Sequence, residues 1–332
     1  MKNDKIVVKK AHESEFPISL YLDSKLNNLS IGDYFDLILP FVVGDLIAKE
    51  NVNFMRKIFD SFPASLTNGL GFECRLDVPE SSRNDFFISI GCSTLERKNF
   101  LDYLERKLPE NFRRLKEWKN IYRFARCWYD PTSSFYDKIL GFWFEFDAPP
   151  VTAKYVPNIF IIARDPSVST DISMYDWFTK DVFRLLKGRE MSRSVKKNFK
   201  KSIENLPDDT SIHAIGLMLN RSADVRICIK RIKTNQIKDY VDSINLPLGD
   251  ECIFTLLEEI KKRVNRFVLQ ISVDGKGISP YLGVECSFEP TLFHKEERWK
   301  SFLEYLVRKK LCTPSKFYSL LRFLGITYNN KM

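Results

Sequence analysis

The stretch that decides the fold is Leu140-Gly141-Phe142-Trp143-Phe144-Glu145-Phe146-Asp147, in which phenylalanine alternates with other side chains. Because successive side chains of a β-strand point to opposite faces, this alternation predicts a strand with one phenylalanine face. Related stretches begin at Leu70, at Leu282 and, more loosely, at Ile215. Recurrence at intervals of about 70 residues indicates a repeated structural unit.

Each copy belongs to a predicted β-hairpin, because two alternating segments flank a short run of turn residues. The four predicted strand pairs are 72–78 with 86–92, 141–147 with 158–164, 212–220 with 225–232, and 267–273 with 281–288. In the last pair the recurring stretch lies on the second strand, so the duplication is not strict. A fifth hairpin is predicted near the N-terminus, from 6–9 and 18–22.

Between the hairpins the apolar period becomes helical, as in the stripe Trp299, Phe302, Leu303, Leu306 and Val307. The predicted helical stretches are 32–62, 96–108, 111–128, 174–204, 236–263 and 295–324. Two start signals support them: Ser93 and Glu96 match a capping box, and Thr313 followed by Pro314 matches an N-cap with a first-turn proline.

The side chains of every predicted hairpin separate into an apolar face and a polar face. Phe142, Phe144 and Phe146, for example, oppose Trp143, Glu145 and Asp147. The sequence therefore predicts an α+β protein of repeated β-hairpin and helix units, whose antiparallel sheet has helices on one face. Closure of this sheet into a barrel with a polar lumen is the alternative, because closure removes exposed edges. We expect a single domain, 1–332, of four or five units, with similar halves 1–165 and 166–332 as the alternative.

The amino-acid composition limits the cellular compartment and the kinds of partner to be expected. Seven cysteines without a Cys-x-x-Cys pair fit reduced thiols in a cytoplasmic protein, and three scattered histidines predict no metal site. We expect no membrane span and no secretory signal. The net charge of +9 is concentrated in two basic runs, 113–126 and 187–201. No nucleic-acid-binding motif accompanies them, so a peptide or protein partner is expected rather than nucleic acid.

The alternation Arg226-x-Cys228-x-Lys230, together with the predicted architecture, resembles the ABBA-type prenyltransferases, which are barrels of α-β-β-α repeats. That family often shows Arg-x-Lys-x-Tyr here, so cysteine replaces its middle cation. The resemblance implies that Arg226 and Lys230 bind an isoprenyl diphosphate, accompanied by magnesium if the ion is needed. It also implies the remaining site residues, which are Arg75, Arg164 or Tyr281 as assisting groups, Glu73 or Glu145 as the base, and Trp143 as a shield for the allyl cation.

A second resemblance concerns 282–288 followed by Leu311-Cys312-Thr313-Pro314, which looks like accessory proteins of peptide natural-product maturation. Two functions therefore stay open: a peptide- or partner-binding protein, and a transferase acting on a peptide or aromatic acceptor. The acidic residues assigned to the polar face outnumber the basic ones and would repel a diphosphate, since two charges about 4 Å apart interact by roughly 4 kcal/mol. They are Glu73, Asp77, Glu145, Asp147, Asp274, Glu285 and Glu289. This balance favours the binding protein.

Overall fold

The structure is a computed structural model that describes residues 29–42, 44–78, 84–150, 155–164, 171–221, 224–246, 252–288 and 297–323. The hairpin predicted from 6–9 and 18–22 lies outside the described residues, as does Glu289.

Within the described residues, eight strands form a sheet whose order follows the chain from β1 to β8. The pairs β1–β2, β4–β5, β5–β6, β6–β7 and β7–β8 are antiparallel. The strands are β1 (Gly69–Cys74), β2 (Asn84–Gly91), β3 (Ile139–Ala148), β4 (Asn158–Ala163), β5 (Ser211–Leu217), β6 (Val225–Lys230), β7 (Arg266–Val273) and β8 (Gly283–Ser287). All four predicted hairpins within the described residues are confirmed, and so is the α+β class. Closure into a barrel stays a prediction.

The contacts group the chain into two compact units. Unit 1 comprises Met1–Ile90, Glu145–Tyr155 and Phe288–Met332, and unit 2 comprises Gly91–Phe144 and Val156–Ser287. The expectation of a single domain stays a prediction.

Unit 1 contains β1, most of β2 and helices that precede and follow the sheet in the chain. The helices are α1 (Ile31–Val42), α2 (Lys49–Phe59), the 3-10 turn η1 (Ala64–Leu66), α10 (Arg298–Arg308) and α11 (Pro314–Phe323). The predicted stretch 32–62 is thus divided, and Gly44 has a φ of +101° between α1 and α2. The predicted cap of α11 is confirmed, because the Lys316 backbone N–H donates to Thr313 Oγ1 over 3.3 Å.

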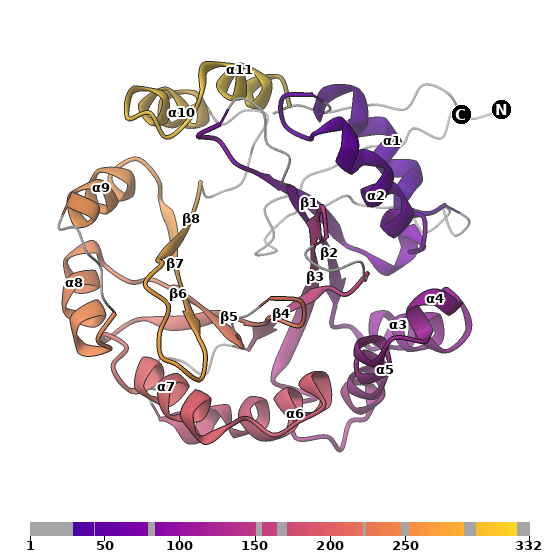
Figure 1. Ribbon diagram of the computed structural model, residues 1–332. Helices are drawn as coiled ribbons and strands as arrows, with labels where there is room; N and C mark the ends of the chain where they lie inside the picture. Colours follow the sequence, from indigo (N-terminus) through magenta and orange to yellow (C-terminus); the bar gives the residue numbers. More distant parts are fainter. Residues whose placement is uncertain are drawn as a thin grey trace. The chain divides into compact units, whose positions relative to one another are not determined.

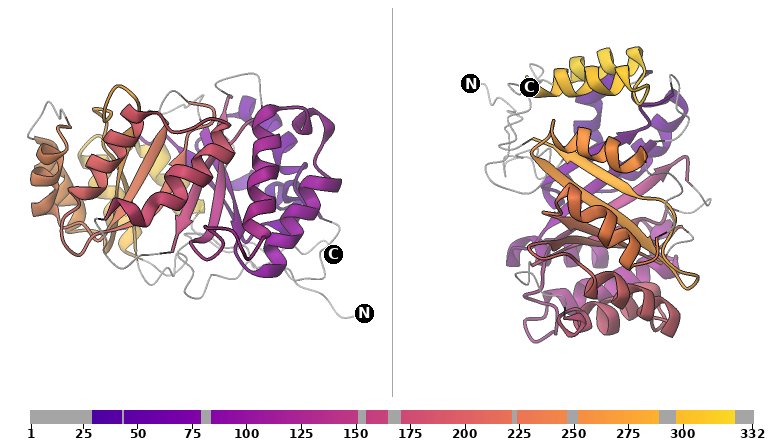
Figure 2. Two further views of the ribbon diagram at one scale, coloured as in Figure 1. Left: turned by 90° about the horizontal axis from the view of Figure 1, so that it is seen from below. Right: turned by 90° about the vertical axis from the view of Figure 1, so that its left-hand side faces the viewer.

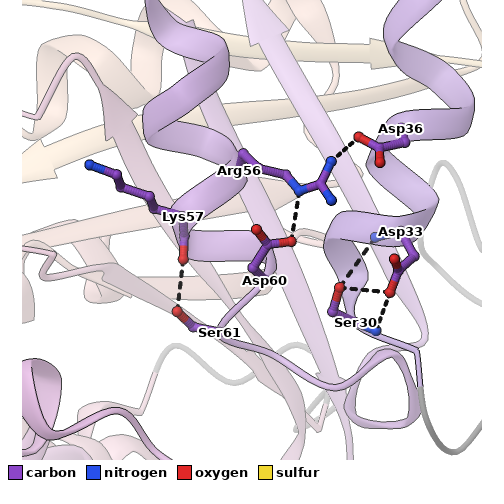
Figure 3. A network of polar contacts seen from close by, with 7 residues as sticks. All are labelled: Ser30, Asp33, Asp36, Arg56, Lys57, Asp60 and Ser61. Atoms are coloured by element: carbon purple, nitrogen blue, oxygen red, sulfur yellow. Dashed lines mark hydrogen bonds and ion pairs between the residues drawn. The ribbon is translucent and has the colours of Figure 1, made fainter.

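Polar contacts tie α1 to α2. Arg56 donates to Asp36 of α1 through Nη1 and to Asp60 through Nε over 2.7 Å, so one guanidinium bridges two carboxylates (Figure 3). Its hydrogen bond with Asp36 raises the pKa of Arg56. At the start of α1, Asp33 accepts from the Ser30 backbone N–H over 2.7 Å. The α10 helix packs on Phe288, whose ring centroid is 4.8 Å from that of Trp299 and 6.2 Å from that of Phe302.

Unit 2 contains most of β3 and the strands β4 to β8, with helices on their outer side (Figure 1). Seen from below, α6 and α7 lie in front of these strands (Figure 2, left). The helical elements are α3 (Thr94–Arg106), α4 (Glu110–Arg113), α5 (Lys116–Tyr129), the 3-10 turn η2 (Ile172–Tyr175), the π-helix η3 (Trp177–Val182), α6 (Phe183–Lys187), α7 (Arg193–Glu204), α8 (Thr234–Ser243) and α9 (Cys252–Lys261). The capping box of Ser93 and Glu96 is confirmed at the start of α3.

The phenylalanine face of β3 lies under helices. Phe142 packs against Phe100 of α3 and against Phe124 and Trp128 of α5, with ring centroids 5.2–5.7 Å apart. Phe142, Phe144 and Phe146 are all at most 1% exposed, so the prediction that this face is covered is confirmed.

The opposite face, called the inner face below, is not polar throughout. Phe160, Ala214, Met218, Cys228 and Val268 form a buried apolar cluster there, and Trp143 packs against it. The prediction of a polar face is therefore wrong at the centre of unit 2. Strand pairing brings isolated apolar residues of separate strands together, as it does Ala214 and Cys228. The alternation within a single strand does not reveal which residues of other strands lie beside it.

Candidate functional site

The register of β4 to β8 arranges the inner face of unit 2 in rows across the strands. One row runs Phe160, Gly216, Arg226 and Ser272, because each residue is the pairing partner of the next. Two residues further along β6, Cys228 opposes Ala214 and Gln270. The third row runs Lys230, Val268 and Glu285, and in the fourth Arg266 opposes Ser287.

Aromatic rings occupy the end of the face at the first row. Trp143 of β3 stacks on Phe160 of β4, with centroids 5.1 Å apart and planes 7° from parallel. The guanidinium carbon of Arg226 lies 5.8 Å from the Phe160 ring centroid, within cation–π range. Arg226 Nε also donates to Ser272 Oγ over 3.4 Å, which steadies the guanidinium beside the rings.

Cations gather at the opposite end. Lys230 ends β6 and Arg266 begins β7, and they are diagonal neighbours, because Lys230 opposes Val268. Diagonal Cα atoms of paired strands lie roughly 7–8 Å apart, so two long cationic side chains can reach one anionic group. Arg266 Nη2 lies 3.2 Å from His213 Nε2. An arginine only donates, so Nε2 accepts and His213 is the neutral Nδ1–H tautomer in this pair.

The apolar cluster lies between Phe160 and Lys230, whereas the Trp143 ring centroid is 6.4 Å from that of His213, which contacts Arg266. Cys228, Ala214 and Val268 are fully buried between Phe160 and Lys230. Arg226 and Lys230 are four residues apart on β6, which corresponds to roughly 13 Å along the strand. The inner face of unit 2 thus combines stacked aromatic rings, a buried apolar cluster and three cations, of which Arg226 lies beside the rings.

Glu285 of β8 is the carboxylate of this face. Gln270 Nε2 donates to Glu285 Oε1. Burial raises the pKa of Glu285, while the Gln270 hydrogen bond and the positive charges of Arg266 and Arg226 act in the opposite direction. Because burial dominates, this carboxyl holds its proton at a higher pH than an ordinary glutamate does.

The structure brings together three of the site residues expected from the sequence, Trp143, Arg226 and Lys230, on the inner face. The others lie elsewhere. Arg75 follows β1 and pairs with Asp77 over 3.0 Å. Arg164 is exposed just after β4, and its backbone N–H donates to the Lys138 carbonyl over 2.8 Å.

Tyr281 precedes β8 in a loop and is 81% exposed. The two carboxylates expected as bases belong to unit 1. Glu73 is exposed on β1, whereas Glu145 of β3 is only 4% exposed. On β3 Glu145 follows Trp143 by two residues, which directs both side chains to the same side of that strand. The roles of Glu73, Glu145, Arg75, Arg164 and Tyr281 stay predictions.

The structure changes the charge balance expected for the strands. Asp77 lies beyond β1 and pairs with Arg75. Asp274 lies beyond β7, where its Oδ1 accepts from the backbone N–H groups of Lys276 and Gly277 over 2.7 and 3.0 Å. Among the described strand residues of unit 2 on the inner face, Glu285 is the carboxylate, while Arg226, Lys230 and Arg266 are cations. Within unit 2 the described strand residues of this face thus carry more positive than negative charge, while Glu145 and Asp147 of β3 belong to unit 1.

Sequence reasoning missed Phe160, Arg266, His213, Gln270 and Glu285 as members of the site. Alternate residues of a strand share one face, so Arg266, four residues before Gln270, could have been placed on this face from the sequence. His213 had no such signal, because the register shifts between Ile212 and Ala214 and its side chain sits at that irregularity.

The described ranges contain no cluster of three or more His, Cys, Asp or Glu side chains arranged to hold a metal ion. No helix in the described part of the chain has both the length and the apolar character needed to cross a bilayer. Comparisons with models of known families, with curated proteins and with solved structures found no match for this chain.

Proposed function

We propose that the inner face of unit 2 binds an isoprenyl diphosphate, and that the protein is a prenyltransferase-like enzyme that transfers the isoprenyl group to a peptide or aromatic acceptor. The observation that carries this proposal is that cations and aromatic rings share this face. Lys230 and Arg266 are diagonal neighbours, and Trp143, which stacks on Phe160, is half-buried. An isoprenyl diphosphate combines an anionic head with an apolar tail.

The binding would combine two effects. Lys230 and Arg266 would donate charge-assisted hydrogen bonds to the diphosphate, and these are stronger than neutral ones. The isoprenyl group would lie against Trp143, which is half-buried and stacks on Phe160, because an aromatic face stabilises a developing allyl cation. In the transfer, the C–O bond to the diphosphate breaks, the acceptor attacks the same carbon, and the acceptor's proton passes to a base.

The element order supports this proposal. Consecutive antiparallel hairpins with intervening helices are the arrangement expected from the resemblance to ABBA-type prenyltransferases. The second candidate is a non-catalytic protein that binds a peptide or partner, with a place in peptide natural-product maturation. The same face favours it if the ligand is a peptide with acidic and aromatic side chains.

Isothermal titration of the full chain with dimethylallyl and geranyl diphosphate, with and without magnesium, tests the proposal. Lys230→Ala and Arg266→Ala should each weaken binding by roughly 1.5–3 kcal/mol, the range for hydrogen bonds to charged groups. Lys196→Ala, which removes a cation from α7, is the matched control and should leave the affinity unchanged. Transfer is then assayed by mass spectrometry of tyrosine- and tryptophan-containing peptides incubated with the diphosphate that binds.

Absence of binding to either diphosphate under both conditions would end the transferase proposal. Binding without transfer to any peptide would favour the binding protein. In that case the peptides themselves should bind, and Lys230→Ala should weaken them.

A further inference from the structure

The helix α7 carries a concentration of positive charge outside the inner face. Arg193, Lys197 and Lys200 are exposed, and Lys196 and Lys201 are half-buried. Residues three and four positions apart lie on the same side of a helix, so these five cations share one face of α7. The Glu204 carboxylate on this face pairs with Lys200 over 3.4 Å.

This placement of charge works against the helix itself. Like charges three or four residues apart destabilise a helix, and Arg193 with Lys197 and Lys197 with Lys201 are such pairs. Cations near a helix N-terminus also oppose the macrodipole, and the first turn of α7 has no acidic residue. The helix is held instead by its other face, where Val195, Phe199 and Ile203 are at most 1% exposed. Packing therefore fixes the cations on a rigid element.

A turn adds to this surface at the N-terminal end of α7. Asn198 Nδ2 donates to the Asp274 carbonyl over 2.9 Å, which clamps the turn after β7 on the helix. A Cβ built on Gly275 would lie 3.2 Å from Ser194 Oγ, so this turn passes close to the first residues of α7. Lys276 in the turn is exposed, whereas the Asp274 carboxylate is occupied by the turn's own N–H groups. We define the α7 patch as Arg193, Lys196, Lys197, Lys200, Lys201 and Lys276.

We propose that the α7 patch docks an acidic segment of a polypeptide. Charge complementarity is the argument. Five of its six cations are lysines, which are flexible point charges, rather than the arginines that favour phosphate through bidentate geometry. The five helical cations are spaced by three and four residues along α7, a spacing that glutamates three and four residues apart on a second helix would match. The exposed residues of α7 include no aromatic side chain to stack on nucleic-acid bases or enter a membrane.

Fluorescence anisotropy of the full chain with a fluorescein-labelled oligoglutamate peptide at low salt tests this proposal. The test variant replaces Arg193, Lys197, Lys200 and Lys201 with glutamine, and it should weaken binding by about tenfold or more. The matched control replaces four cations of α5 with glutamine: Lys116, Lys119, Arg123 and Arg126. It removes the same amount of positive charge from another exposed basic helix face. The control should bind within about twofold of the unmodified chain, because it leaves the α7 patch intact. Its net charge equals that of the test variant, so a difference between the two variants reports the position of the charges.

Equal loss in the two variants would overturn the proposal, because it would show attraction by net charge alone. So would oligoglutamate that does not bind at low salt, or oligouridine RNA or phosphatidylserine vesicles that bind while oligoglutamate does not. Circular dichroism checks the fold of each variant. The double variant Lys197→Gln with Lys200→Gln, which changes only exposed side chains, decides the question if the larger variant unfolds. Diphosphate binding to the inner face is a separate measurement, so either proposal can fail without the other.

Discussion

Replacement of Arg97 by methionine should destabilise unit 2 strongly, because this buried arginine joins three elements. Arg97 of α3 is only 6% exposed. Its Nε donates to the Cys92 carbonyl over 2.8 Å and its Nη1 to the Trp128 carbonyl at the end of α5 over 3.0 Å. The contact of Nη2 with the Ile139 carbonyl of β3 is 3.5 Å, too long to count as a full hydrogen bond. Burial lowers the pKa of Arg97, so its charge is retained at a cost.

The contacts give the magnitude. Methionine removes the charge and with it the cost of burying it, but it leaves the Cys92 and Trp128 carbonyls without this donor. Each buried polar group left without a partner costs about 1–3 kcal/mol. The guanidinium also lies between two rings, 4.7 Å from the Trp128 centroid and 4.1 Å from that of Tyr136, and this stacking is lost too. Water can reach part of the vacated space, so we expect a net loss of about 2–4 kcal/mol.

Urea denaturation followed by far-ultraviolet circular dichroism measures this loss as a change in the free energy of unfolding. Lys98→Met is the matched control, because Lys98 is the next residue of the same helix and is exposed. It should change the free energy by less than about 0.5 kcal/mol. Arg97→Lys should remain destabilised, since one ammonium cannot donate to both carbonyls and has no planar face to stack. An Arg97→Met chain as stable as the control would refute the reasoning.

Two further predictions concern α10 and the inner face. Leu303→Ala should lower the free energy of unfolding by about 2–5 kcal/mol, because Leu303 is 4% exposed. Ser301→Ala, at an exposed position of the same helix, serves as control. A loss below about 0.5 kcal/mol for Leu303→Ala would mean that the apolar stripe of α10 is not part of the core. Glu285 has a folded-state pKa above its ordinary 4.5, so its protonated form stabilises the fold at low pH and this stability is lost as the pH rises through the folded pKa. Glu285→Gln should therefore gain stability relative to the unmodified chain as the pH rises above about 4.5 in urea titrations, and a difference independent of pH would contradict this assignment.

Local patterns in the sequence determined the elements of this protein. Strict alternation in 142–147 predicted which side of β3 lies under the helices, because a strand side chain has only two directions available. The capping box at Ser93 and Glu96 and the cap at Thr313 could also be predicted from the sequence, because each depends only on residues within one helical turn. The eight described strands followed from such short-range signals.

Only the tertiary structure decided which residues meet across strands. Lys230 and Arg266 are 36 residues apart in the chain, and the β6–β7 register makes them diagonal neighbours. The stacking of Trp143 on Phe160 and the apolar centre of the inner face depend on register in the same way. The register shift at His213 shows why the sequence could not predict these contacts. One irregular residue changes the direction of a side chain without altering the local sequence pattern.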